Sequence, residues 1–94
     1  MKILEFQVMY GVGYDEPIQI PAGAIFLSVI ELDFTPYMQF LCDEFASYET
    51  RYFTLRKTGD VIYENRTYNH PFPGKFLGSF KRRDNFDAYH VFEL

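Results

Sequence analysis

Helical periodicity is almost absent from this chain of 94 residues. Apolar and polar residues instead alternate in short runs that glycine, proline, asparagine and aspartate separate, and alternation with period two is typical of half-buried β-strands. In the run 2–10, for example, Leu4 and Phe6 fall on one face and Glu5 falls on the other. Only the segment 35–48 has a spacing that would also suit a turn or two of helix. The sequence therefore predicts an all-β protein with at most one short helical turn.

About seven short antiparallel strands are expected along the chain. They cover residues 2–10, 18–20, 24–32, 37–42, 49–58, 75–82 and 88–93. Apolar residues fill both faces of 24–32, which predicts a strand in the centre of a sheet. Thr35-Pro36 is expected to form the turn that follows it, and the last two runs make the clearest hairpin. Short strands with short connections predict a compact β-sandwich or small barrel, as one domain over residues 1–94.

Eleven phenylalanines and eight tyrosines, with no tryptophan, are a large aromatic content for so short a chain. A domain of this size buries only about 60% of its unfolded surface, and aromatic rings supply the most apolar area per residue. Most phenylalanines are therefore expected in the core or in cross-strand pairs, whereas tyrosines are divided between core and surface. The single cysteine, Cys42, excludes an internal disulfide and a cysteine-based zinc site, and it is expected to pack as a small apolar side chain.

Charge is distributed unevenly between the two halves of the sequence. Residues 1–50 carry eight acidic side chains and one lysine, whereas residues 51–94 carry eight basic and five acidic side chains. The net charges of −7 and +3 make the −4 of the whole chain, and such an acidic protein is unsuited to general binding of duplex nucleic acid. A local basic face in the second half would suit an anionic nucleotide or an acidic protein. The alternative is that strands from the two halves pair and neutralise one another across the sheet.

No arrangement of residues predicts catalysis, a metal site or a cofactor. The segment 11–13 (Gly-Val-Gly) lacks the third glycine and the following helix of a dinucleotide-binding loop, so a flexible hairpin loop is expected. The histidines, His70 and His90, are far apart and have no metal-ligand spacing. His90 falls within the last expected strand, where a hydrogen-bonded structural role is expected. Asp43 and Glu44 are adjacent, so in a strand their carboxylates point to opposite faces.

Two parts of the second half combine aromatic and basic residues and are candidates for binding. The first is the long loop 59–74, and loops of this length in compact domains are usually functional or disordered. The second is the end of the hairpin strand 75–82. The candidate binding residues are Tyr63, Arg66, Tyr68, His70, Lys81, Arg82 and Arg83. Such rings can stack on a base while guanidinium groups hold phosphate, although a solvated hairpin end and rings that cover the core edge are the alternative.

The sequence shows no feature that directs it to a membrane or out of the cell. No apolar run approaches the roughly 18 residues of a membrane span, and Glu5 interrupts the N-terminal apolar residues before a secretory signal could form. Together with the single cysteine, these features predict a soluble protein of the reducing cytoplasm, without a membrane partner.

Four short blocks follow one another along most of the chain. They are Ile-Gln-Ile-Pro-Ala-Gly-Ala-Ile-Phe-Leu-Ser-Val at 18–29, Thr58-Gly59, Phe-Leu-Gly-Ser at 76–79 and His-Val-Phe-Glu at 90–93. In these blocks the chain resembles an uncharacterised family of short phage and bacterial proteins. It departs from that family in the cluster 81–83 and in its many phenylalanines and tyrosines. The resemblance implies an all-β domain of phage or prophage origin, and the family has no activity to transfer.

The leading hypothesis is a phage-encoded, non-enzymatic binding protein in the cytoplasm of the infected host cell. It is expected to engage and inhibit a host defence or metabolic protein, because the tyrosines and arginines among the candidate residues suit interface anchors. One alternative is a sponge for an anionic nucleotide, which the basic second half would favour, and another is a minor structural protein of the virion. Exposed aromatic residues and open edge strands also predict a homodimer.

Overall fold

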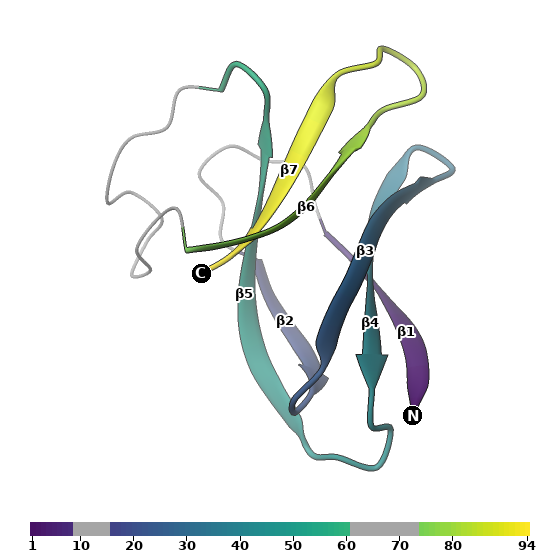
Figure 1. The fold of residues 1–94 in the computed structure, drawn as a ribbon, viewed down its shortest axis with the longest axis vertical. Coiled ribbons are helices and arrows are strands. Elements are labelled where there is room, and N and C mark those ends of the chain that lie inside the picture. Colours follow the sequence, from purple (N-terminus) through teal and green to yellow (C-terminus); the bar gives the residue numbers. More distant parts are fainter. Residues whose placement is uncertain (9–15, 61–73) are drawn as a thin grey trace.

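The computed structural model describes residues 1–8, 16–60 and 74–94. Within these ranges the chain forms seven antiparallel strands and no helix (Figure 1). The described residues therefore contain no helix that could cross a membrane. The strands are β1 (Lys2–Gln7), β2 (Glu16–Pro21), β3 (Ile25–Leu32), β4 (Thr35–Cys42), β5 (Tyr48–Lys57), β6 (Lys75–Lys81) and β7 (Ala88–Glu93). The predicted all-β class is confirmed, and the architecture is an open sandwich of two sheets rather than a closed barrel.

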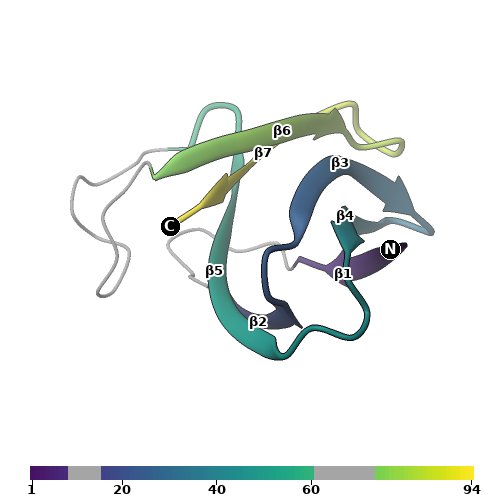
Figure 2. The same ribbon diagram turned by 60° about the horizontal axis from the view of Figure 1, so that its bottom comes forward.

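The first sheet has the strand order β1-β4-β3, and the second has the order β2-β5-β7-β6. The long strand β5 pairs with β2 along its first half and with β7 along its second half, and only Phe53 has a partner on both sides. β3 and β6 are edge strands of different sheets, and they run side by side in the same direction (Figures 1 and 2). Their first residues therefore meet at one end of the molecule, and the hairpins that follow them meet at the other.

The prediction that 24–32 lies in the centre of a sheet is wrong, because β4 holds that place and β3 is an edge strand. The alternate side chains Met38 and Phe40 of β4 are fully buried between the sheets. In β3, Val29 packs in the core, whereas Ile25 on the opposite face is 56% exposed. Apolar residues on both faces of β3 therefore do not mark a strand that is covered on both sides.

The turn between β3 and β4 also differs from the expected one. Thr35 and Pro36 lie within β4, and the turn consists of Asp33 and Phe34. The φ angles of Asp33 and Phe34 are 49° and 63°, and positive values at both central residues are what a two-residue type I′ hairpin turn requires. Pro36 has no N–H to donate, but its carbonyl oxygen accepts the N–H of Val8 at 3.1 Å.

Phe40 lies at the centre of the core and joins the two sheets. Its ring contacts Phe6 and Phe26 of its own sheet at centroid distances of 6.0 and 5.5 Å, and Phe53 of the other sheet at 5.8 Å. All three contacts are edge-to-face, the arrangement that the aromatic quadrupole favours. Other phenylalanines of the described residues are exposed instead, namely Phe34, Phe45, Phe76 and Phe86.

Cys42 is fully buried at the end of β4, which confirms its expected packing, and its thiol donates to the carbonyl oxygen of Phe40 at 3.6 Å. Burial raises the pKa of this thiol above its ordinary value, against smaller opposite effects of the Leu4 backbone and the Arg51 charge. An unfolded cysteine ionises near pH ~8.5. Above that pH only the unfolded state loses the proton, so we expect the free energy of unfolding to fall by up to about 1.4 kcal/mol per pH unit.

Urea unfolding between about pH 8 and 10 tests this expectation. The fall should be steeper in the wild-type protein than in Cys42→Ala, which lacks the titrating thiol but keeps the other ionisable groups. Equal slopes in the two proteins would contradict it.

Candidate functional site

The structure places part of the predicted binding set at one end of the molecule. Tyr63, Arg66, Tyr68 and His70 lie outside the described residues. The cluster 81–83 lies where β6 ends and the hairpin to β7 begins, as expected. This hairpin end lies beside the turn between β3 and β4 in both views of the fold (Figures 1 and 2). We call the two hairpin ends together, residues 32–35 and 81–88, the tip surface.

Glu31 fastens the two hairpin ends to each other. Its side chain is only 3% exposed, and its carboxylate accepts the backbone N–H of Arg83 at 2.8 Å and lies 3.4 Å from Nε of Arg82. Arg82 also donates to Asp84 at 3.0 Å, and its backbone N–H donates to the carbonyl oxygen of Asp87 at 2.9 Å. Two of these hydrogen bonds, from the Arg83 N–H to Glu31 and from Arg82 to Asp84, involve a carboxylate, and such charge-assisted bonds are about twice as strong as neutral ones. The guanidinium of Arg82 is therefore part of the brace that fixes the tip surface.

Two phenylalanines project from the braced tip surface. Phe34 is 59% exposed and Phe86 is 75% exposed. Their φ angles are 63° and 60°, a conformation that bulky L-residues rarely adopt and that costs roughly 1–2 kcal/mol for each residue. Within the described ranges Asp33 is the one further non-glycine residue with positive φ, and it lies in the same turn as Phe34. Strained backbone outside glycine is thus confined, over those ranges, to the tip surface.

Lys81 and Arg83 give the tip surface a positive rim. Both residues are exposed, and neither side chain forms an ion pair with another residue in the part of the chain that the structure describes. The nearby carboxylates of Asp84 and Asp87 are matched by basic side chains of the protein, at 3.0 and 3.8 Å. The rim therefore carries two positive charges that no carboxylate of the described residues neutralises.

No protein-family model, curated protein or solved structure matches this chain. The resemblance to a family of phage proteins therefore stays a prediction. The chemistry of the tip surface comes from its own residues, which supply two exposed aromatic rings, a rigid brace and a positive rim.

His90 is held by two hydroxyl groups. Its Nε2 lies 2.7 Å from Oγ1 of Thr58, and its Nδ1 lies 2.7 Å from Oγ of Ser79. A neutral imidazole donates from one nitrogen and accepts at the other, and two hydroxyls satisfy either tautomer. The expected hydrogen bonding of His90 is confirmed.

Among the residues with described positions, no group of three His, Cys, Asp or Glu could hold a metal ion.

Three residues of this arrangement, Glu31, Phe34 and Phe86, are not predicted from the sequence. The sequence contains a signal for Glu31 in the uneven charge of its two halves, because Glu31 of the acidic half pairs with Arg82 of the basic half. The signal for Phe34 is its place in an Asp-Phe pair between two apolar runs, although Asn-Gly is the usual signal of such a turn. Phe86 has no comparable local signal.

Proposed function

We propose that this protein is a small, non-enzymatic binding protein that engages a partner protein through the tip surface. The observation that carries the proposal is the pair Phe34 and Phe86, both exposed and both at positive φ. Backbone strain persists only where the surrounding structure enforces it, and it is concentrated at binding sites and switch regions. Aromatic residues are enriched in protein interfaces and depleted on other surfaces. Two exposed rings on strained backbone therefore support a binding role for this surface.

The side chains of the tip surface support a partner of a particular chemistry. Phe34 and Phe86 need an apolar hollow, and Lys81 and Arg83 need carboxylates at its rim. Opposite charges at a rim steer the encounter and select the partner, whereas the buried rings supply most of the affinity. In the phage setting that the sequence resemblance implies, the partner is a host defence or metabolic protein of the cytoplasm, which the binding inhibits.

Replacing Phe34 or Phe86 with glycine should separate binding from stability. Each substitution removes roughly 1–2 kcal/mol of positive-φ strain, and the larger entropy of unfolded glycine takes back about 0.5–1 kcal/mol. The net gain of about 0–1.5 kcal/mol should therefore raise the melting temperature by up to roughly 12 °C in each variant. Loss of an aromatic anchor should at the same time weaken partner binding by at least about 30-fold. Thermal unfolding gives the first result, and calorimetric titration with a partner captured from phage-infected cells gives the second.

Phe45→Gly is the matched control for this prediction. Phe45 is 90% exposed, has no positive φ, and lies in the loop between β4 and β5, away from the tip surface (Figure 1). This variant should bind the partner like the wild type and show no rise in melting temperature. Unchanged affinity in both tip variants would overturn the proposal. So would a wild-type homodimer that the two tip variants dissociate, because the tip surface would then join two copies of this chain.

A further inference from the structure

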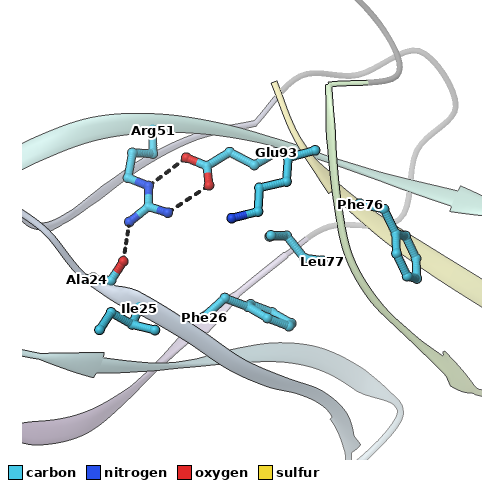
Figure 3. A pocket seen from close by; sticks show the side chains of 8 residues that line it. Ala24, Ile25, Phe26, Arg51, Phe76, Leu77 and Glu93 are labelled. Atoms are coloured by element: carbon cyan, nitrogen blue, oxygen red, sulfur yellow. Dashed lines mark hydrogen bonds and ion pairs between the residues drawn. The ribbon is translucent and has the colours of Figure 1, made fainter.

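A pocket opens at the other end of β3 and β6, away from the tip surface. It lies between the first residues of these two edge strands and includes residues of β5 and β7 (Figure 3). Its volume is about 310 Å³, near the lower end of the roughly 300–1,000 Å³ that is usual for small-molecule sites. The pocket therefore has room for a molecule of about the size of a mononucleotide.

An ion pair forms the polar floor of the pocket. Nε and Nη2 of Arg51 donate to the two carboxylate oxygens of Glu93 at 2.6 and 2.7 Å, and Nη1 donates to the carbonyl oxygen of Ala24 at 2.7 Å (Figure 3). The hydrogen bond to Glu93 raises the pKa of Arg51 above its ordinary value, so the guanidinium stays charged. It lies 5.3 and 5.8 Å from the ring centroids of Phe40 and Phe53. A guanidinium has five N–H groups, and these three bonds use three of them.

Apolar side chains form part of the walls of the pocket, beside the polar groups of Arg51, Lys75 and Glu93. Figure 3 shows Leu77 directed from β6 toward the ion pair, with Ile25 and Phe26 on the β3 side. Each of the two edge strands is irregular here, with a register shift within 26–28 in β3 and within 76–78 in β6. A bulge inserts an unpaired residue and changes the direction of nearby side chains, and bulges are common beside binding sites.

Lys75 adds a positive charge that the protein leaves unmatched. It is the cross-strand partner of Glu93, but Glu93 is engaged by Arg51, and over the described ranges Lys75 forms no ion pair. Gly74 precedes it with a φ of 63°, and a Cβ at this position would lie 2.2 Å from the carbonyl oxygen of Glu93. Only glycine can therefore bring the chain into β6 at this place. The pocket holds two cations and one carboxylate, and so it favours an anion.

We propose that this pocket binds a small organic anion with a flat apolar body, the shared chemistry of nucleoside monophosphates and aromatic carboxylates. The anionic group contacts Lys75 and the remaining N–H groups of Arg51. The apolar body lies against Ile25, Phe26 and Leu77. The pocket is independent of the tip surface. Its residues give a place to the anionic ligand that the basic second half of the sequence suggests.

The test is an NMR titration of the intact protein with adenosine 5′-monophosphate and with 1-naphthoate. Their uncharged counterparts, adenosine and 1-naphthalenemethanol, are titrated in parallel. We expect at least one anion to shift the backbone amides of Ile25, Lys75 and Leu77, and to bind about tenfold more tightly than its uncharged counterpart. A response to the nucleotide alone identifies a phosphate ligand, and a response to naphthoate alone identifies a carboxylate ligand. Absence of pocket shifts with both anions would overturn the proposal.

Two lysines at opposite ends of β6 give a matched pair of variants. Lys75→Gln should weaken binding of the responding anion about tenfold, and Lys75→Arg should restore most of it. Lys81→Gln removes the same charge from the same strand, at the tip surface, and should leave the affinity unchanged. Equal weakening by Lys75→Gln and Lys81→Gln would show attraction to the net charge of the protein and would overturn the proposed site.

Discussion

Replacing Phe40 with alanine is expected to lower the free energy of unfolding by about 3–5 kcal/mol, the usual range for a buried phenylalanine. The ring is fully buried and contacts aromatic rings of both sheets, Phe26 at 5.5 Å and Phe53 at 5.8 Å. Among the described residues, the cavity would open where aromatic rings of the two sheets contact one another. Domains of this size have only about 5–15 kcal/mol of stability in total, so the variant should be close to unfolding. Urea unfolding at constant temperature measures the loss.

Two further variants serve as controls for the Phe40→Ala prediction. Phe40→Leu retains much of the apolar volume, so it should lose less stability than Phe40→Ala and should remain measurable if the alanine variant does not fold. Phe45→Ala makes the same deletion at a ring that is 90% exposed, and it should change stability by no more than about 0.5 kcal/mol. A loss below about 1 kcal/mol in Phe40→Ala would show that the sheets do not depend on this ring.

Much of the fold follows from the sequence because strand alternation is a local property. A pleated strand points successive side chains to opposite faces, so a half-buried strand must alternate wherever it occurs. The expected hairpin of 75–82 and 88–93 is observed as β6 (Lys75–Lys81) and β7 (Ala88–Glu93). The prediction of β4 also succeeds in type, although the strand begins two residues earlier than expected, at Thr35.

The errors arise where the sequence shows that a residue is apolar but not what covers it. Apolar side chains on both faces of β3 suggest double burial, yet one face covers the core and the other leads into the pocket, where Ile25 is 56% exposed. The turn is missed for a different reason. Phe34 occupies a position with φ of 63°, where glycine is the usual residue, and the neighbouring Thr35-Pro36 is a more typical turn signal.

The candidate sites depend on pairing between distant parts of the chain, which local patterns do not contain. Glu31 and Arg83 are 52 positions apart, and Arg51 and Glu93 are 42 positions apart. The cluster 81–83 could be located at a hairpin end because hairpins are local. Its neighbour in the other sheet, Glu31, could not be predicted, because strand order and register determine which distant residues meet.

The two edge strands explain why both sites lie where they do. An edge strand has one side without a hydrogen-bonded neighbour, and charged side chains are common on such strands because they prevent further pairing. β3 and β6 carry the tip surface at one end and the pocket at the other. The ring of Phe26 in β3 packs against Gly78 in β6, where a Cβ would lie 3.3 Å from it. The proposed anion site and the proposed partner site therefore lie at opposite ends of one pair of packed strands.

Replacing Arg51 with methionine is expected to lower the free energy of unfolding by about 2–4 kcal/mol, somewhat less than the roughly 3–5 kcal/mol of a fully buried pair. The Arg51 and Glu93 side chains are 18% and 20% exposed, so water screens part of the loss. The substitution leaves the Glu93 carboxylate without its cation and the Ala24 carbonyl without its donor. The hydrogen bond to the Ala24 carbonyl joins the residue before β3 to the second sheet, so the substitution also removes one contact between the sheets. Arg83→Met, at an exposed side chain without an ion pair in the described ranges, is the control and should change stability by no more than about 0.5 kcal/mol.

A double-mutant cycle shows whether the pair itself stabilises the protein. Arg51→Met combined with Glu93→Gln leaves no unmatched charge, so the double variant should lose about 1–3 kcal/mol less than the two single variants lose together. Additive losses would mean that Arg51 acts through packing on Phe40 and Phe53 and not through Glu93. In either case Arg51→Met should weaken anion binding, because the proposed anionic group contacts the N–H groups of Arg51 that Glu93 and Ala24 leave unused. If the losses are coupled, the pair is first a structural link between β5 and β7 of one sheet that holds Arg51 toward the Ala24 carbonyl, and Lys75 supplies the charge that distinguishes an anion from its uncharged counterpart.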